Sequence, residues 1–295
     1  MDLTGKVAVV TGAGRGLGRS YARALAAAGA AVVVNDVDAD VADTVVNEIE
    51  SAGGNAAAQV GPVGPTQTAE DLVNRADELF GRLDIMCTNA GIVRDRTLKK
   101  LTDDDFDLVI ETHLRGTFTC GRAAARYFAE QGEGGRIIVI GSPAGQRGNF
   151  GQTAYAAAKA GIVCFVRTWA MELAKDNVTV NAVIPIALTR MVATIPGLAE
   201  VVERVERGEP VPDDMRANGL GTADDVAPLV VFLASDAAAG ITGQAIGLGG
   251  DKLAVWTHPD EAVTELRAGG WDADAIAAEW ESSLAAHAEP VGERS

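Results

Sequence analysis

The chain has 295 residues, of which 47% are hydrophobic and 22% charged, a composition typical of a soluble globular protein with one large domain. Its formal net charge of −16 argues against nucleic-acid binding, because recognition of a phosphate backbone needs a basic surface. The three cysteines, Cys87, Cys120 and Cys164, are too few and too scattered for a disulfide framework or a metal site. We therefore expect a reducing compartment and no bound metal.

The sequence also argues against a membrane protein. The first residues, Met1 to Lys6, contain no apolar signal region. No apolar run reaches the roughly 18 residues that a membrane-spanning helix needs. These observations predict a cytoplasmic protein that does not partner a membrane.

Apolar runs alternate with helical patterns through the first 250 residues or so. The runs are continuous, as in strands buried on both faces of a parallel sheet. We expect strands at Val7–Thr11, Ala31–Asn35, Ile85–Thr88, Arg136–Ile140, Val178–Ile184 and Ala245–Leu248, and helices at 17–28, 38–52, 66–80, 103–130, 153–174 and 222–235. This order predicts an α/β fold, a doubly wound, Rossmann-like parallel sheet with helices on both faces.

The domain organisation follows from where this alternation stops. We expect a single catalytic domain over 1–252 and a C-terminal helical extension over 253–295, with Asp272 capping a helix that runs to about Ala286 and with the last few residues disordered. The segment 190–218 is rich in proline, glycine and charge. It is either a mobile lid or a surface excursion.

A glycine-rich turn joins the first expected strand to the first expected helix. Gly12, Gly16 and Gly18 lie within the run Thr11–Gly18. Glycines there allow a tight turn and a close approach of the backbone to a pyrophosphate, which the positive end of the helix dipole then faces. The turn predicts a dinucleotide site; the alternative is a plain glycine-rich turn.

The end of the second strand indicates which dinucleotide binds. Asp36 follows the glycine loop by about 20 residues, the position of a carboxylate that accepts hydrogen bonds from the adenosine ribose. The same charge would repel a 2′-phosphate, so we expect NAD rather than NADP. Arg15 is the counter-argument, since a cation in the loop would attract that phosphate. A solvated strand end is the alternative role for Asp36.

Three polar residues near the fifth strand predict proton chemistry. Ser142 directly follows that strand, and Tyr155 and Lys159 come later on a predicted helix. Residues four apart share a helical face, so both side chains can point at one spot. A neighbouring ammonium favours a phenolate and lowers the tyrosine pKa from about 10. Such pairs are usually structural; the serine and the nucleotide loop make this one informative.

With these motifs combined, the chain resembles the short-chain dehydrogenase/reductase family over residues 1 to about 250. The matching motifs are Thr11–Gly18, Asn89-Ala90-Gly91, Ser142, Tyr155 with Lys159, Val180-Asn181-Ala182 leading to Pro185, and Ile241-Thr242-Gly243-Gln244. The resemblance implies hydride transfer between a nicotinamide cofactor and a secondary alcohol or ketone. It also implies a homo-oligomer, either a dimer or a tetramer.

The resemblance assigns roles by position. Tyr155 would be the general acid/base, Ser142 would hydrogen-bond the reacting oxygen, and Lys159 would lower the Tyr155 pKa and bind the nicotinamide ribose. The cofactor contacts it implies are Gly12, Arg15, Gly16, Leu17, Asp36, Val63, Asn89, Ala90, Gly91, Tyr155, Lys159, Pro185, Ile186 and Thr189.

Three positions depart from the family pattern. His113 stands where the family has a catalytic asparagine, whose backbone carbonyl helps to hold a proton-relay water. Histidine keeps that carbonyl; a structural role for its side chain is favoured over a direct proton role. Pro62 replaces an aspartate that contacts the adenine, and Pro185-Ile186 replaces the usual Pro-Gly.

His113, the phrase Gly91–Leu98 and Thr189-Arg190-Met191 together resemble one branch of the family. It contains the hydroxyacyl-CoA dehydrogenase part of multifunctional β-oxidation enzymes and related bacterial acyl-CoA or steroid dehydrogenases. Arg147 and Arg190 would flank the mouth of the site. A basic cluster would receive the coenzyme A phosphates or is simply a solvated helix start; it comprises Arg94, Arg96, Lys99 and Lys100.

We therefore expect NAD-dependent oxidation of a 3-hydroxyacyl-CoA or a similar small-molecule secondary alcohol. A hydroxysteroid dehydrogenase and a 3-oxoacyl carrier-protein reductase are the enzyme alternatives; Asp36 argues against the reductase, because biosynthetic reductases prefer NADPH. A nucleotide-binding scaffold protein without turnover is the non-enzyme alternative, and the intact set of Ser142, Tyr155 and Lys159 disfavours it.

Overall fold

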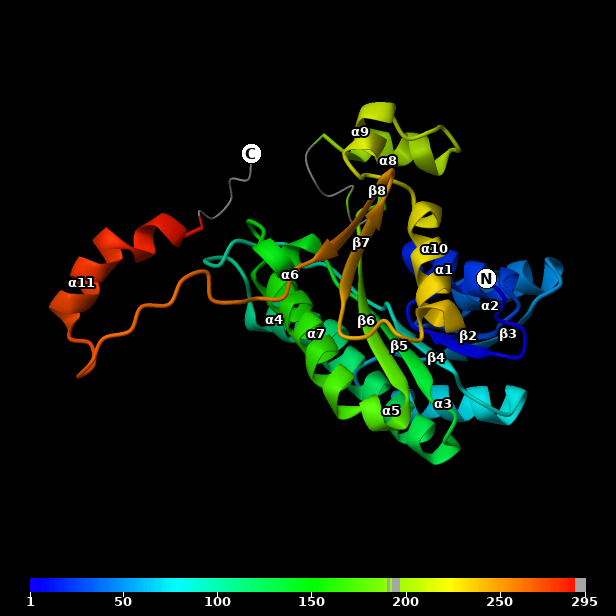
Figure 1. Ribbon diagram of the computed structural model, residues 1–295. Coiled ribbons are helices and arrows are strands. Elements are labelled where there is room, and N and C mark those ends of the chain that lie inside the picture. Colours follow the sequence, from blue (N-terminus) through cyan, green and yellow to red (C-terminus); the bar gives the residue numbers. More distant parts are fainter. Residues whose placement is uncertain (190–191, 193–196, 290–295) are drawn as a thin grey trace. The chain divides into compact units, whose positions relative to one another are not determined.

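The computed structural model describes residues 1–189, 192 and 197–289 (Figure 1). One sheet of eight strands forms in this part of the chain, in the order β3-β2-β1-β4-β5-β6-β7-β8. All neighbours pair in parallel except β7 and β8. The strands are β1 (Val7–Val10), β2 (Ala31–Asp36), β3 (Asn55–Val60), β4 (Ile85–Thr88), β5 (Gly135–Ile140), β6 (Val178–Pro185), β7 (Ala245–Gly249) and β8 (Lys252–Trp256).

Helices cover both faces of this sheet (Figure 1). One buried core joins one face to α1, α2 and α10, and a second core joins the other face to α3, α5 and α7. The helices are α1 (Gly16–Ala27), α2 (Ala39–Ser51), α3 (Thr66–Phe80), α4 (Asp103–Ile110), α5 (Gly116–Gln131), α6 (Pro143–Arg147), α7 (Thr153–Glu172), α8 (Ala199–Glu206), α9 (Asp213–Ala217), α10 (Ala223–Ala234) and α11 (Ala273–Ser282). The predicted doubly wound fold is confirmed.

The apolar strand runs form because each strand faces both cores. Along β1, Ala8 and Val10 belong to the core with α1, while Val7 and Val9 belong to the core with α5. All four residues are buried. The order of connections reverses between β1 and β4. Doubly wound folds bind ligands in the crevice outside the carboxyl ends of the strands at such a reversal.

Two strands were not predicted. β3 is rich in alanine and half-exposed, so its sequence lacks the strong apolar run of the inner strands; it forms because all six of its residues pair with β2. β8 alternates exposed and partly buried positions and pairs antiparallel with β7. Both are edge strands, whose formation depends on a neighbouring strand more than on their own composition.

The expected continuous helix over 103–130 is interrupted. A π-helical turn at Glu111–Arg115 separates α4 from α5. Such turns widen a helix locally and frequently occur at functional sites. His113 lies at its centre.

The chain divides into two compact units, Met1–Trp256 and Thr257–Ser295. The first ends four residues beyond the expected boundary at 252, because β8 belongs to the sheet. In the second unit the Asp272 side chain caps α11 by accepting a hydrogen bond from Ala275 N at 2.8 Å. α11 ends at Ser282, and a short 3-10 helix follows at Leu284–His287. The last residues, 290–295, lie outside the described residues.

Part of the segment 190–218 also lies outside the described residues, at 190–191 and 193–196. The rest forms α8 and α9 around a small apolar cluster in which Leu188, Val202 and Val211 are buried. Among the described residues, no helix combines the length and the apolar character needed to cross a bilayer.

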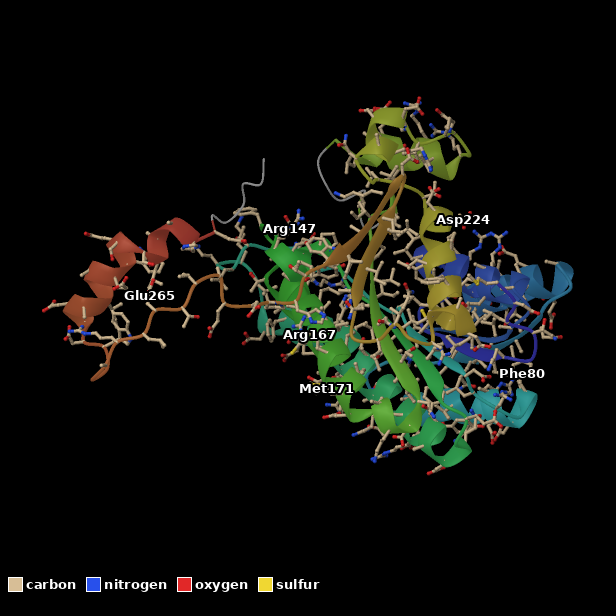
Figure 2. The ribbon with its side chains drawn as sticks, viewed as in Figure 1. Phe80, Arg147, Arg167, Met171, Asp224 and Glu265 are labelled. Carbon is tan, nitrogen blue, oxygen red and sulfur yellow. The ribbon has the colours of Figure 1, made fainter. Side chains whose placement is uncertain are left out.

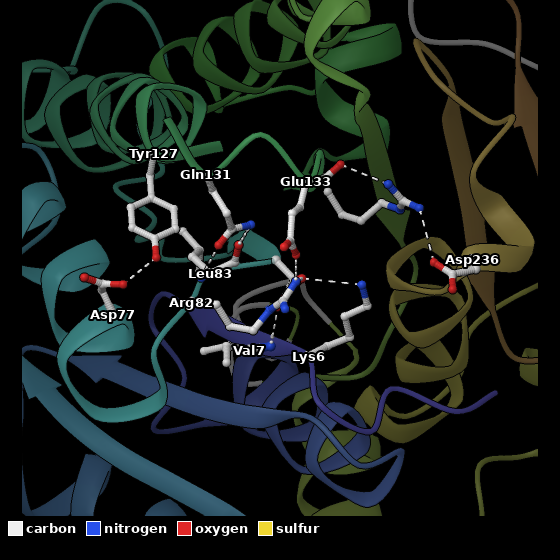
Figure 3. Close-up of polar contacts among 12 residues, drawn as sticks. Lys6, Val7, Asp77, Arg82, Leu83, Tyr127, Gln131, Glu133 and Asp236 are labelled. Carbon is white, nitrogen blue, oxygen red and sulfur yellow. Dashed lines mark hydrogen bonds and ion pairs between the residues drawn. The ribbon is translucent and has the colours of Figure 1, made fainter. Parts of the chain in front are cut away.

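An ionic network fastens the amino-terminal end of the sheet (Figure 3). Arg82 donates two hydrogen bonds to Asp84 at 2.8 and 2.7 Å and a third to Glu133 at 2.7 Å. Asp84 also accepts from Val7 N at 2.9 Å, which ties β1 to the start of β4. These partners raise the pKa of the Arg82 guanidinium, mainly through Asp84. The network is at the end of the sheet opposite the crevice.

Candidate active site

The glycine loop between β1 and α1 has a shape that other residues would break. Gly12 and Gly16 adopt the left-handed region with φ of 59° and 52°. A Cβ on Gly12 would lie 2.7 Å from Ala90 Cα, and one on Gly18 would clash with Gly12 O. A Cβ on Gly16 would meet only open space, so this side of the loop is accessible. The loop therefore presents bare backbone and the start of α1 to the crevice, as a pyrophosphate site requires.

The segment Asn89-Ala90-Gly91 is fastened to this loop. Asn89 Nδ2 donates to Thr11 O and to Gly12 O, each at 3.0 Å. Thr11 Oγ1 accepts from Asn89 N and from Ala90 N, also at 3.0 Å. Thr11 is a site residue that our sequence reasoning used only as part of a motif; its hydroxyl sets the spacing of the two loops.

Asp36 is held at the rim of the loop by backbone amides. Its Oδ2 accepts from Gly14 N at 3.0 Å and its Oδ1 from Val37 N at 2.8 Å. Arg15, the residue that argued for a 2′-phosphate, forms an ion pair with Asp38 at 2.9 Å. The carboxylate is thus oriented at the end of β2, and the nearby cation already has an anionic partner.

The remaining expected cofactor contacts follow the carboxyl ends of β1, β3 and β6. Val63 is buried beside Gly116, whose Cβ would lie 2.8 Å from Val63 Cγ2. Leu17 packs against the core with α1. Beyond β6, Ile186 N donates to Leu248 O at 3.1 Å, which fixes the backbone leading from Pro185 to Thr189.

The three expected catalytic residues come from two neighbouring elements. Ser142 lies two residues beyond the end of β5 and caps α6, where its Oγ accepts from Ala144 N at 3.2 Å. Tyr155 and Lys159 share one face of α7. Lys159 is buried; its Nζ donates to Ile140 O at 2.6 Å and lies 5.7 Å from the centre of the Tyr155 ring. The structure therefore brings Ser142, Tyr155 and Lys159 together at the carboxyl end of β5.

Burial dominates the protonation of this group. It raises the pKa of Tyr155, against a hydrogen bond with Ser142 that lowers it, and the Asp95 charge raises it further. Burial lowers the pKa of Lys159 to about 7. The expected lowering of the Tyr155 pKa is therefore not found in the protein alone, because loss of solvation outweighs the favourable neighbours.

His113 lies beneath the site as a neutral ring. Burial and the Lys159 charge lower its pKa to about 3. Its Nε2 lies 2.7 Å from Ile92 O and 3.0 Å from Ile92 N, and the ring meets Tyr155 edge-on with centroids 5.2 Å apart. A Cβ on Gly91 would clash with the imidazole. These contacts give the side chain a packing role and disfavour a direct proton role.

The backbone of the π-helical turn has its own role. Gly116 N donates to Glu111 O and to His113 O, the carbonyl that the family uses for a relay water. A carbonyl oxygen has two lone pairs and can accept more than one hydrogen bond. The backbone function expected at this position is compatible with the histidine.

The basic cluster is only partly engaged. Arg94 and Arg96 approach Asp105 at 3.6 and 4.0 Å, whereas Lys99 and Lys100 are exposed. Arg147, labelled in Figure 2, lies over the Trp256 ring of β8 at 4.6 Å. Arg190, the other residue expected at the mouth, lies outside the described residues.

Sequence reasoning also missed two residues beside Tyr155. Gln152, which precedes α7, donates from Nε2 to Asp95 Oδ2 at 3.1 Å. The phrase containing Asp95 was noticed for its resemblance, but no pattern in the sequence linked it to a residue 57 positions later. Only the fold brings the loop after β4 against the start of α7.

Proton transfer beside a bound dinucleotide is the chemistry this arrangement allows, and it places the chain among the Rossmann-type oxidoreductases. The family model for short chain dehydrogenases matches residues 6–196. The chain belongs to this family, which uses nicotinamide cofactors, and the family predicted from the motifs is confirmed.

Known relatives narrow the comparison. Over 259 residues the chain is 39% identical to a peroxisomal hydratase-dehydrogenase-epimerase of Neurospora crassa, covering 85% of this chain and 27% of that protein. It is 42% identical over 275 residues to the hydroxyacyl-CoA dehydrogenase ChsB1 of Mycobacterium tuberculosis, covering 88% and 81%. It is 41% identical over 253 residues to a 3-oxoacyl-[acyl-carrier-protein] reductase of Synechocystis, covering 85% and 98%.

A solved structure shows the same architecture. A short chain dehydrogenase from Mycobacterium avium superposes with a TM-score of 0.84 at 36% identity, covering 99% of this chain and 98% of that one. The chain spans only about a quarter to a third of the peroxisomal multifunctional relatives, at 27%, 32% and 27% of their lengths.

Proposed function

We propose that the protein oxidises a 3-hydroxyacyl-CoA, or a closely similar secondary alcohol, with NAD. The observation that carries this proposal is the meeting of Ser142, Tyr155 and Lys159 at the end of β5, beside a glycine loop shaped for a dinucleotide. Relatives named for hydroxyacyl-CoA dehydrogenation support the substrate class. A scaffold without turnover would have no need of a buried lysine beside a tyrosine, since burying that ammonium is costly.

Asp36 supports NAD as the cofactor. Its carboxylate is oriented by Gly14 N and Val37 N at the end of β2, where a ribose would lie. A 2′-phosphate would meet this negative charge, and Arg15 is paired with Asp38. We propose that the cofactor is held by the backbone of the loop from Gly12 to Leu17, by Asp36, by the Asn89–Gly91 segment with Val63, by Tyr155 and Lys159, and by Pro185, Ile186 and Thr189.

In the proposed oxidation, the protein's own residues would remove one proton, that of the substrate hydroxyl. The nicotinamide, when bound, supplies the hydride acceptor and a positive charge that favours phenolate. The Tyr155 oxygen takes the proton of the substrate hydroxyl. Ser142 Oγ accepts from Ala144 N, and its hydroxyl, which hydrogen-bonds Tyr155 in the free protein, would donate to the reacting oxygen once substrate binds. Lys159, anchored by Ile140 O, places its charge beside Tyr155 and uses its remaining donors for the ribose.

Reduction is a second candidate that two observations favour. The Synechocystis relative is named as a 3-oxoacyl carrier-protein reductase and is covered almost completely. Burial raises the pKa of Tyr155, which keeps the phenol protonated and ready to act as an acid.

We propose that Lys99 and Lys100 receive the phosphates of coenzyme A. Both are exposed, and neither forms an ion pair with another described residue, whereas Arg94 and Arg96 share Asp105. Exposed ammonium groups on the loop that borders the site can attract a polyanionic ligand.

The enzyme acts, in this proposal, as a homo-oligomer in the cytoplasm. α5 and α7 carry a ladder of aromatic rings in which Phe118 and Phe165 lie 6.4 Å apart and Phe165 stacks on Trp169 at 4.8 Å. Phe118 is 39% exposed on this face, and Met171, at another position on the surface of α7, is 75% exposed (Figure 2). Exposed apolar faces of this kind mark protein interfaces, and a second copy is the expected occupant. Three free cysteines suit a reducing compartment.

A substrate screen tests the proposal. Reduction of NAD and of NADP is followed at the nicotinamide absorbance band with 3-hydroxyacyl-CoAs, hydroxysteroids and simple secondary alcohols, and the reverse reaction with 3-oxoacyl thioesters. We expect the highest kcat/KM with an acyl-CoA and NAD. A preference for NADPH and a carrier-protein thioester would favour the reductase, and no turnover with any alcohol would contradict an enzymatic role.

A further inference from the structure

The loop after β4 lies along the segment that precedes α7. Arg96 N donates to Gly151 O at 2.8 Å, and Arg96 forms a parallel bridge with Gln152. This pairing holds the backbone of Asp95 beside Gln152, which precedes Tyr155 by about one helical turn.

Two amide side chains orient the Asp95 carboxylate. Gln152 Nε2 donates to Asp95 Oδ2 at 3.1 Å, and Gln152 Oε1 in turn accepts from Asn149 Nδ2 at 2.9 Å. Amides carry no charge, so this chain positions the carboxylate without neutralising it. The charge remains available to act on its surroundings.

The other carboxylate oxygen is left without a partner. Asp95 Oδ1 is buried and accepts no hydrogen bond within the described part of the chain. A buried acceptor without a donor costs free energy, and such an atom in a folded protein calls for an explanation. The explanation that we favour is electrostatic: the Asp95 carboxylate keeps its negative charge close to Tyr155, where it raises the pKa of that phenol.

The charges that face Tyr155 come from several elements. Lys159 on α7 lies near the ring, His113 in the π-helical turn is neutral at physiological pH, and Ser142 at the start of α6 adds a hydroxyl. Among these described neighbours, Asp95 contributes the negative charge. An anion that entered beside Tyr155 would therefore meet a fixed carboxylate at low dielectric, where repulsion is strong.

We propose that Asp95 is a specificity-determining residue that excludes substrates carrying a free carboxylate beside the reacting alcohol and so selects neutral acyl derivatives, thioesters or esters. Repulsion of the wrong substrate is a common route to specificity. The inference rests on the proposed function, because it names which acyl derivatives the same site accepts. A 3-hydroxy acid and its thioester differ at this position by one negative charge.

The test compares a neutral and a charged substrate that lack coenzyme A. Methyl 3-hydroxybutanoate and 3-hydroxybutanoate are oxidised by the wild-type protein, by Asp95→Asn and by Asp107→Asn. Asp107 is exposed on α4 and loses the same charge, which makes it the matched control. Each pair is measured at low salt and at high salt, because salt screens exposed charges far more than buried ones.

The wild type should prefer the ester by at least about tenfold in kcat/KM, and Asp95→Asn should reduce that preference by about tenfold, equivalent to about 1.4 kcal/mol. Asp107→Asn should keep the wild-type preference, and high salt should leave it in place. Equal use of acid and ester by the wild type, use of neither, or an unchanged preference in a folded Asp95→Asn would overturn the inference.

The wild-type comparison decides the question even if Asp95→Asn does not fold. Preference for the ester together with no turnover of acyl-CoA would contradict the proposed function and leave the exclusion of carboxylates standing. Preference for acyl-CoA over simple alcohols together with equal use of ester and acid would support the proposed function and overturn the exclusion of carboxylates.

Discussion

Lys159 gives the sharpest test of the electrostatics of the site. Its ammonium is buried and has one recorded hydrogen bond, to Ile140 O at 2.6 Å. Burial lowers its pKa from 10.5 to about 7. Each pKa unit is worth about 1.4 kcal/mol, so the buried charge destabilises the folded chain by about 5 kcal/mol relative to the neutral amine.

The sign of the pH dependence follows from the two states. Below about pH 7, Lys159 is protonated in both the folded and the unfolded chain, and the folded state bears the full cost of the buried charge. Between about 7 and 10.5 the folded chain holds a neutral amine while the unfolded chain is still protonated. The wild-type free energy of unfolding therefore gains about 1.4 kcal/mol per pH unit from this group in that window.

Lys159→Met removes the titration at nearly constant volume. At pH 6.5 the variant avoids the cost of about 5 kcal/mol but leaves Ile140 O unpaired, a loss of about 1–3 kcal/mol. We expect it to be more stable than the wild type by about 2–4 kcal/mol at pH 6.5, from these same terms. The advantage should shrink by about 3 kcal/mol at pH 9, and turnover should be lost.

Urea unfolding without cofactor, followed by tryptophan fluorescence, measures the difference at both pH values. Lys175→Met is the matched control, because Lys175 is exposed in a 3-10 helix and its replacement should give the same difference at pH 6.5 and pH 9. A stability difference between Lys159→Met and the wild type that does not change with pH would refute the reasoning.

Four further variants test separate parts of the molecule. Tyr155→Phe should lower turnover by roughly 10²–10⁴-fold while NAD still binds in calorimetry; undiminished turnover would contradict the acid/base role. Asp36→Ala should lower the ratio of kcat/KM with NAD to kcat/KM with NADP. An unaltered ratio would contradict the proposal that Asp36 binds the adenosine ribose and repels a 2′-phosphate. Replacing Lys99 and Lys100 by alanine should raise KM for an acyl-CoA but not for a simple alcohol; an equal rise for both would exclude the phosphate role. Asp84→Asn should lower the free energy of unfolding by about 3 kcal/mol with kcat intact, and a stability equal to that of the wild type would show that the network in Figure 3 is dispensable.

Much of the fold was predictable because its inner strands are continuous apolar runs. β1, β2, β4, β5, β6 and β7 were all expected from such runs, and each forms in the parallel sheet. β3 and β8 were missed because each lies at an edge of the sheet and depends on its pairing with a neighbour. The π-helical turn at Glu111–Arg115 was missed because the periodicity of α4 and α5 reads as one helix.

The candidate site divides in the same way. The glycines of the nucleotide loop, Asp36, Ser142, Tyr155 and Lys159 could be named from spacing, since each follows a strand or shares a helical turn. Asp95 and Gln152 could not, because they meet across 57 positions of sequence. The direction of the Tyr155 pKa was also wrong for the protein alone, since spacing shows a neighbouring lysine but not how far burial removes water.

By itself, the sequence determined the order of strands and helices, the glycines that a tight turn requires, and the identity of the residues that can carry a proton. These are local properties, set by apolar periodicity, backbone freedom and functional groups. Only the tertiary structure decided the protonation of Tyr155, Lys159 and His113 and the position of the Asp95 charge. Those depend on solvent exclusion and on contacts between distant segments, which exist only once the sheet and its helices have closed around the site.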